Sequence, residues 1–180
     1  GLFIGGTTVV AGTWGGGVSI STDGGDNWTT TTSGQNGFAN SNTVTAVVVD
    51  GATFVAGTWG GVSISTDGGA NWTTITSGQN GFADDNNVLS VFVDGTTIVA
   101  GTTSGGVSIS TDGGANWTTT TSGQNGFANS SSIHGVSVDG TTIVAGTWGG
   151  GVSISTDGGA NWKTTTSGQN DFANSNEVRS

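Results

Sequence analysis

One octapeptide, Ser-Thr-Asp-Gly-Gly-X-Asn-Trp, occurs four times in this chain of 180 residues. The copies cover residues 21–28, 65–72, 110–117 and 155–162, at intervals of 44, 45 and 45 residues. The shorter interval arises in a loop, because Thr-Trp-Gly-Gly-Gly at 13–17 becomes Thr-Trp-Gly-Gly at 58–61. A period of this length is typical of stacked supersecondary units. We therefore expect one domain over residues 1–180, with repeat units at about 1–42, 43–86, 87–131 and 132–175.

The second unit shows the expected strands of each repeat. Residues 44–49 form the most apolar run and should be an innermost strand that is buried on both faces. Asp50-Gly51 then predicts a tight hairpin turn. Residues 53–58, 62–65 and 72–76 follow as three more strands, of which 62–65 alternates strictly between apolar and polar residues. Residues that favour helices are scarce and no helical stripe appears, so the fold class is all-β.

A four-stranded antiparallel meander repeated every 40–50 residues fits a β-propeller blade. We expect a β-propeller of four such blades, each with a hairpin at its octapeptide. The period alone also fits a flat β-solenoid, which stays as the alternative.

Composition excludes several classes of function. The chain has 36 glycines and no cysteine, and its net charge is −10 with two basic residues, Lys163 and Arg179. It can form neither a disulfide scaffold nor a thiolate metal site, and it cannot neutralise the phosphates of a nucleic acid. No apolar run is long enough to insert into a membrane. We interpret the chain as a mature secreted bacterial protein of the extracellular space or cell surface, without cofactor or metal.

Each octapeptide resembles the Asp-box, S-x-D-x-G-x-x-W, of sialidases and other BNR-repeat propellers. The resemblance covers all four units, and in that family the box is a hairpin that stabilises the fold. The physical chemistry agrees, because the carboxylate can accept from turn N–H groups, glycine permits left-handed backbone and tryptophan can fill the space between blades. The residues that match are Ser21, Asp23, Gly25, Trp28, Ser65, Asp67, Gly69, Trp72, Ser110, Asp112, Gly114, Trp117, Ser155, Asp157, Gly159 and Trp162.

The resemblance to sialidases does not extend to catalysis. That chemistry needs an arginine cluster and a tyrosine nucleophile, but this chain has no tyrosine, one arginine and one glutamate, Glu177. Asp84 and Asp85 are interpreted as solvated loop residues rather than a glycosidase pair. His134 is interpreted as a half-exposed strand residue. We therefore expect no enzyme and no catalytic residues.

The loops after the second strand of each unit are the candidates for ligand binding. Trp14, Trp59 and Trp148 lie in these loops, and Thr103 stands in their place in the third unit. Together with the Ser-Gly-Gln-Asn loops on the same face, they could bind a sugar ring by stacking and amide hydrogen bonds. The alternative is structural: the tryptophans pack over glycines, and a phenylalanine anchors each long loop, at Phe38, Phe82, Phe127 and Phe172.

The two ends of the chain each match one half of an innermost strand. Residues 176–180 align with 42–46, the first half of such a strand, and residues 1–5 align with 46–50, its second half, so residues 1–5 could complete the strand that residues 176–180 begin. This completion could close a ring within one chain, join neighbouring chains, or belong to a longer array. The expected self-association residues are Leu2, Phe3, Ile4, Glu177, Val178 and Arg179.

Two hypotheses for function follow. The first is an extracellular structural protein that self-associates by strand completion as a homo-oligomer or polymer, such as the subunit of a surface filament or sheath. The alternative is a multivalent, lectin-like propeller that binds carbohydrate.

Overall fold

The computed structural model describes residues 1–170, 172–173 and 175–179 and contains four antiparallel sheets of four strands each. In every sheet the strands lie in chain order, so each sheet is a meander. The sheets, here called blades 1 to 4, are β1 Leu2–Gly5, β2 Thr8–Gly12, β3 Val18–Ser21 and β4 Thr29–Thr31; β5 Val44–Asp50, β6 Thr53–Thr58, β7 Gly61–Ser65 and β8 Thr73–Ile75; β9 Val88–Asp94, β10 Thr97–Thr102, β11 Val107–Ser110 and β12 Thr118–Thr120; and β13 Ile133–Asp139, β14 Thr142–Thr147, β15 Val152–Ser155 and β16 Lys163–Thr165.

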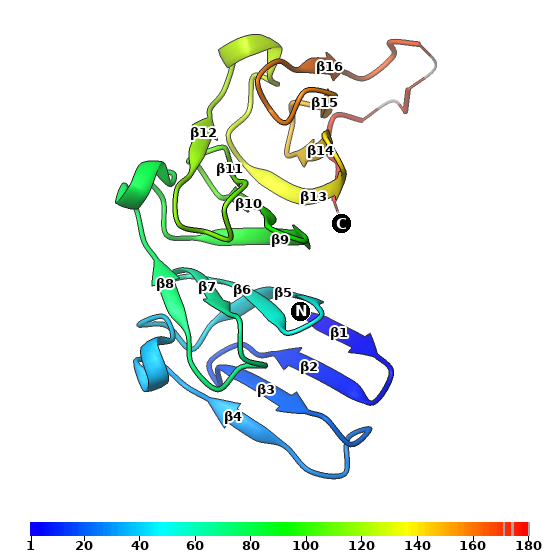
Figure 1. Ribbon diagram of the computed structural model, residues 1–180. Helices are drawn as coiled ribbons and strands as arrows, with labels where there is room; N and C mark the ends of the chain where they lie inside the picture. Colours follow the sequence, from blue (N-terminus) through cyan, green and yellow to red (C-terminus); the bar gives the residue numbers. More distant parts are fainter. Residues whose placement is uncertain (171, 174, 180) are drawn as a thin grey trace.

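The blades stack side by side around a common centre, which is the arrangement of a β-propeller (Figure 1). The innermost strands pack against one another in sequence, β1 against β5, β5 against β9 and β9 against β13. This architecture confirms the all-β propeller of four blades and excludes the solenoid.

The four blades form an arc and do not close a ring. Figure 1 shows blade 1 and blade 4 at opposite ends of this arc. The innermost strands therefore line an open centre, and most of β5 is only half-buried. The prediction that residues 44–49 are buried on both faces was wrong for this reason.

The apolar core lies between the blades, because the facing sides of neighbouring sheets are buried against each other. In β7, Val62 and Ile64 face a core that blade 2 shares with blade 3. Ser63 faces the other way, and its hydroxyl accepts a hydrogen bond from the backbone N–H of Ala39, in the loop that leaves blade 1. Alternation along the strand therefore separates an apolar side from a small polar side, both of which are buried.

The observed strand ends differ slightly from those expected. Strand β5 extends to Asp50 and β7 begins at Gly61, while β8 begins one residue later than expected, at Thr73. Trp72 lies outside β8 because its backbone N–H donates to the carbonyl oxygen of Asn36 in blade 1. One short 3-10 turn follows each of the first three blades, at Gln35–Gly37, Gln79–Gly81 and Gln124–Gly126. In the part of the chain that the structure describes, no helix is long and apolar enough to cross a membrane.

Candidate functional site

The octapeptide turns are closed hydrogen-bond networks, as the second unit shows. The hydroxyl of Ser65 donates to Asp67 Oδ1 at 2.8 Å and accepts from the backbone N–H of Gly69 at 2.8 Å. Asp67 also accepts from the backbone and side-chain N–H groups of Asn71, at 2.9 and 2.8 Å. The indole N–H of Trp72 donates to the carbonyl oxygen of Gly69 at 3.0 Å. The other three octapeptides form the same bonds, so their Ser, Asp and Trp side chains and their Gly backbone stabilise the turn.

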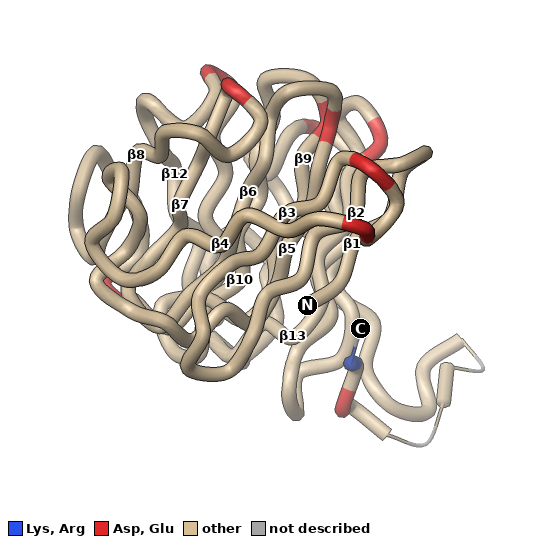
Figure 2. The backbone as a smooth tube through the Cα atoms, turned by 90° about the horizontal axis from the view of Figure 1, so that it is seen from below, with Lys and Arg blue, Asp and Glu red and all other residues tan. Residues whose placement is uncertain are grey.

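These hydrogen bonds hold the turn carboxylates in their charged form. The backbone N–H of Asn71, followed by its side-chain amide and the Ser65 hydroxyl, lowers the pKa of Asp67 to about 2. The pKa values of Asp23, Asp112 and Asp157 are lowered to about 2 by the equivalent donors. A carboxyl group with such a pKa is a poor proton donor at neutral pH. Most Asp and Glu residues lie in turns or at strand ends, where Figure 2 shows the red segments of the backbone.

Each joint between blades uses the same aromatic and backbone contacts. The ring of Trp72 in blade 2 packs edge-on against Phe38 of the preceding loop, with centroids 5.2 Å apart. The pairs Phe82–Trp117 and Phe127–Trp162 repeat this contact in the next two joints. In all three joints the tryptophan backbone N–H donates at 2.8 Å to an asparagine carbonyl of the preceding loop. The expected anchoring role of the phenylalanines is seen at Phe38, Phe82 and Phe127, which are buried, whereas Phe172 is half-buried.

The two ends of the arc expose the residues that the joints bury. Trp28 in blade 1 is 46% exposed, whereas its three counterparts are 6–7% exposed. Ile154 in blade 4 is 40% exposed, whereas its counterparts Ile20, Ile64 and Ile109 are 5–8% exposed. Sequence reasoning expected every octapeptide tryptophan to fill the space between blades, and it missed the exposure of Trp28 because the first repeat looks like the others. The first repeat has no preceding blade within the chain, and that is the signal that was available.

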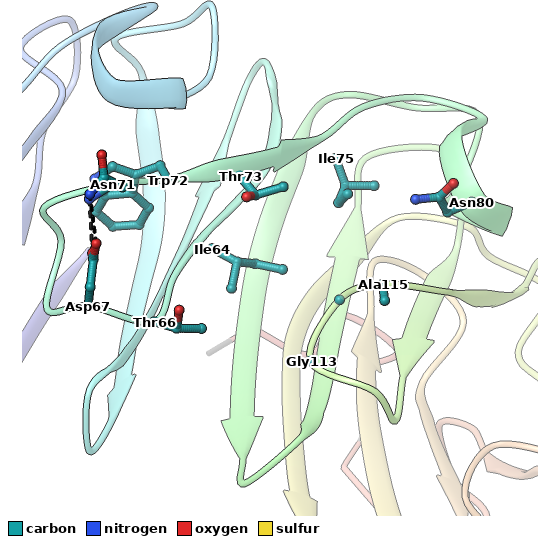
Figure 3. A pocket seen from close by; sticks show the side chains of 11 residues that line it. Ile64, Thr66, Asp67, Asn71, Trp72, Thr73, Ile75, Asn80, Gly113 and Ala115 are labelled. Carbon is teal, nitrogen blue, oxygen red and sulfur yellow. Dashed lines mark hydrogen bonds between the residues drawn. The ribbon is translucent and has the colours of Figure 1, made fainter.

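A small pocket lies beside each joint on the side of the octapeptide turns. In the pocket between blades 2 and 3, Ile64, Thr73 and Ile75 come from blade 2, while Gly113 and Ala115 come from the turn of blade 3 (Figure 3). Corresponding pockets lie between blades 1 and 2 and between blades 3 and 4. On blade 4, Ile154, Trp162 and Lys163 line a pocket of the same kind that no following turn covers. Three of these pockets are therefore parts of joints, and the fourth is open on the side away from blade 3.

The tryptophans of the loops after the second strand of blades 1, 2 and 4, here called the loop-face tryptophans, are exposed and fall into two groups. Trp14, which is 74% exposed, packs edge-on against Trp59, with ring centroids 4.6 Å apart. Trp148 lies instead beside His134, with centroids 5.3 Å apart, and under the guanidinium of Arg179, 4.4 Å from the ring. The structure thus pairs two of the three predicted binding residues and places the third elsewhere. In blade 3, where Thr103 replaces tryptophan, Thr103 bonds to the Asn87 carbonyl.

The interpretation of Asp85 as a solvated residue was wrong. Asp84 is exposed, but Asp85 is buried and accepts from the backbone N–H and the hydroxyl of Ser104, at 2.7 and 2.9 Å. It also accepts from the backbone N–H of Asn87 at 2.9 Å. Asp85 therefore joins the loop after blade 2 to the Thr103 loop of blade 3. A signal was available in the sequence, because Asp85, Thr103 and Ser104 all depart from the residues that the other repeats have at their positions. Departures in two successive loops suggest that the two loops contact each other.

His134 lies half-buried on β13, as expected. Its Nε2 is 3.1 Å from the hydroxyl of Ser132. Among residues 1–170, 172–173 and 175–179, no cluster of three His, Asp or Glu side chains could hold a metal ion.

The predicted self-association residues lie at the two ends of the arc. Strand β1 is the innermost strand of blade 1, where Leu2 is 82% and Ile4 is 74% exposed, while Phe3 is half-buried. At the other end, Glu177 forms an isolated antiparallel β-bridge with Trp148. The backbone N–H of Val178 donates a hydrogen bond to the Thr147 carbonyl oxygen. The same two contacts are found where β5 begins next to blade 1: Thr43 forms a β-bridge with Trp14, and the backbone N–H of Val44 donates to the Thr13 carbonyl. Residues 176–179 thus lie where the first half of a following innermost strand would lie, and Arg179 forms a 3.4 Å ion pair with Glu177.

No protein-family model and no curated protein sequence matches the chain, but solved structures do. An ancestral GH74 enzyme is 26% identical with a TM-score of 0.69, and the match covers 91% of this chain and 23% of that one. The extracellular domain of BT4673 from B. thetaiotaomicron is 17% identical with a TM-score of 0.74, over 98% of this chain and 23% of that one. The computationally designed Ika4 protein is 17% identical with a TM-score of 0.64, over 87% and 89%. The chain thus spans less than a quarter of the first two proteins, and these likenesses show a β-propeller fold.

Proposed function

We propose that this chain is a non-catalytic, extracellular structural protein whose copies associate end to end through blades 1 and 4. One observation carries the proposal: Trp28 and Ile154 are exposed at the two ends, although their counterparts are buried against each other's blades in all three internal joints. The two exposed faces are the two halves of a joint that the chain already builds three times. Full burial of a large apolar side chain contributes about 1.5–3 kcal/mol, and covering the exposed part of Trp28 and of Ile154 would contribute a fraction of this.

The terminal half-strands support the same contact. Residues 176–179 occupy the first half of an innermost strand on blade 4, and β1 supplies the second half on blade 1. When blade 1 of one copy meets blade 4 of another, these segments would form one continuous strand like β5. The contact joins different surfaces of two identical chains, so it can close a ring or extend into a filament.

The non-catalytic part of the proposal rests on chemistry. The turn carboxylates are committed to hydrogen bonds within their turns, and the chain has neither cysteine nor tyrosine. The extracellular part is supported by the likeness to BT4673, whose matched part is an extracellular domain.

Light scattering on the purified chain tests association. We expect a mass above that of one chain, and Trp28→Ser or Ile154→Ser should restore the monomer. Trp59→Ser is the matched control, because Trp59 is also 46% exposed but lies on the loop face. A wild-type chain that stays monomeric at high concentration would refute the proposal.

A second function, carbohydrate binding, is favoured by the exposed Trp14–Trp59 pair. Two perpendicular rings form a ledge on which the apolar face of a sugar can stack. A glycan array followed by calorimetry tests it, and Trp14→Ala should abolish any binding found while leaving the mass unchanged.

A further inference from the structure

The three internal joints all place one small side chain opposite another. The turn residue Ala115 of blade 3 lies across the pocket from Thr73, the first residue of β8 (Figure 3). The pairs Ala70 with Thr29 and Ala160 with Thr118 line the equivalent pockets. In every internal joint, these two positions, one from each blade, therefore line the same pocket.

At the two ends of the arc, both positions change to charged residues of opposite sign. Blade 1 has Asp26 where the other turns have alanine, and blade 4 has Lys163 where the other blades have threonine. Lys163 is the only lysine of the chain. Both side chains are exposed, and within the described residues no carboxylate lies at ion-pair distance from Lys163. Each charge is found only at the end of the arc where no internal partner covers it.

We infer that the open pocket of blade 4 binds the turn at residues 24–26 of a second copy of this chain, and that Lys163 pairs there with Asp26 of that copy. This inference rests on the proposed end-to-end association and names its register. The opposite charges would select this joint over the three internal ones, which have no charge at these positions.

A second contact points to the same register. The carboxylate of Asp50 in blade 2 accepts from the backbone N–H of Gly95 in blade 3 at 2.9 Å. Asp94 in blade 3 accepts in the same way from Gly140 in blade 4, at 3.4 Å. Asp139 is the equivalent residue of blade 4. In the proposed joint, its carboxylate would accept a hydrogen bond from the backbone N–H of Gly6 in blade 1 of the second copy.

The number of copies follows from the number of blades. A ring built only from copies of residues 1–180 contains a multiple of four blades, and a single copy leaves the ring open. Propellers typically close with about four to eight blades. Two copies, with eight blades, are therefore the assembly that this joint predicts, with two identical joints related by a two-fold axis.

A charge-swap experiment tests the pairing. Sedimentation measures the dissociation constant of the wild type, of Asp26→Lys, of Lys163→Glu, of an equimolar mixture of these two variants, and of the double variant. Each single variant places like charges in both joints and should bind itself roughly tenfold more weakly than the wild type. The mixture and the double variant should recover wild-type affinity, and Asp84→Lys, at an exposed loop position, should change nothing.

The outcomes separate this inference from the function on which it rests. A particle of twice the chain mass, weakened by each single variant and restored in the mixture, supports the pairing and the two-copy ring. If both single variants associate as the wild type does, the chain self-associates but the pairing is refuted. Polymers larger than two chains refute the ring, and a monomeric wild type refutes the proposed function together with the inference.

Discussion

Gly37 of the loop after blade 1 lies so close to Trp72 of blade 2 that a Cβ atom on residue 37 would overlap the Trp72 carbonyl oxygen. Gly81 with Trp117 and Gly126 with Trp162 repeat this approach in the next two joints. The glycines have φ between 81° and 84°, in the left-handed region. Both the backbone conformation and the close approach therefore require glycine at these positions.

Gly81→Ala should destabilise the chain more than an alanine at another left-handed glycine. Gly95 is the matched control, because its φ is 57° and nothing lies near the place of its Cβ. The left-handed conformation costs either alanine about 1–2 kcal/mol, and the overlap with Trp117 should add about 1–3 kcal/mol for Gly81→Ala alone. Urea unfolding of both variants measures the difference. Equal losses would show that the loop moves away without cost.

Acid should destabilise the folded chain through its four turn carboxylates. The hydrogen bonds lower the pKa of Asp23, Asp67, Asp112 and Asp157 to about 2 in the folded state, against a reference value of 3.8. A lowered folded-state pKa gives stability that is complete above the unfolded value and is lost as pH falls through the folded value. The Tm should therefore be level from pH 7 to about 5 and should fall between about pH 4 and pH 2.

The variant Asp67→Asn assigns this acid effect to the turns. It should lower the Tm at pH 7 and differ less from the wild type at pH 2, where the wild-type carboxyl is partly protonated. Asp84→Asn serves as the control at an exposed position. A wild-type Tm that does not change down to pH 2 would contradict the assigned role of the turns.

The blades and their turns could be predicted because their causes are local. Alternation in Val62–Ser63–Ile64–Ser65 and the Asp-Gly turn at residues 50–51 act within a few residues, and the repeat displays each pattern several times. The open arc could not be predicted, because it depends on how Trp72 and Phe38 pack between blades. Burial of Asp85 was missed for a related reason, since its partner Ser104 belongs to the next repeat.

The bond between Asp85 and Ser104 should appear as coupling in a double-mutant cycle. Asp85→Ser and Ser104→Gly each remove a part-buried contact, and Asp85→Ser leaves the Ser104 N–H without its 2.7 Å acceptor. Each change should cost about 1–2 kcal/mol. The double variant restores the residues found at these positions in blade 4 and the loop before it, Ser130 and Gly149, so its cost should fall short of the sum by about 0.5–2 kcal/mol. Additive losses would show that the two loops do not depend on each other.

The last prediction concerns Asp171, which stands in the sequence where the other repeats have Gly37, Gly81 and Gly126. Residue 171 lies outside the described residues, and the prediction uses its place in the repeat alone. In the three internal joints, a Cβ atom on the equivalent glycine would overlap the tryptophan carbonyl oxygen of the next blade. Asp171 should therefore weaken the joint between chains while leaving the three internal joints untouched.

Asp171→Gly should accordingly tighten self-association, with a dissociation constant at least several-fold below that of the wild type in sedimentation. Asp171→Ala is the control: it removes the charge and keeps the Cβ atom, so it should gain much less than glycine. An equal gain from both variants would assign the effect to charge repulsion. No gain from either would show that blade 4 does not meet blade 1 in the geometry of the internal joints.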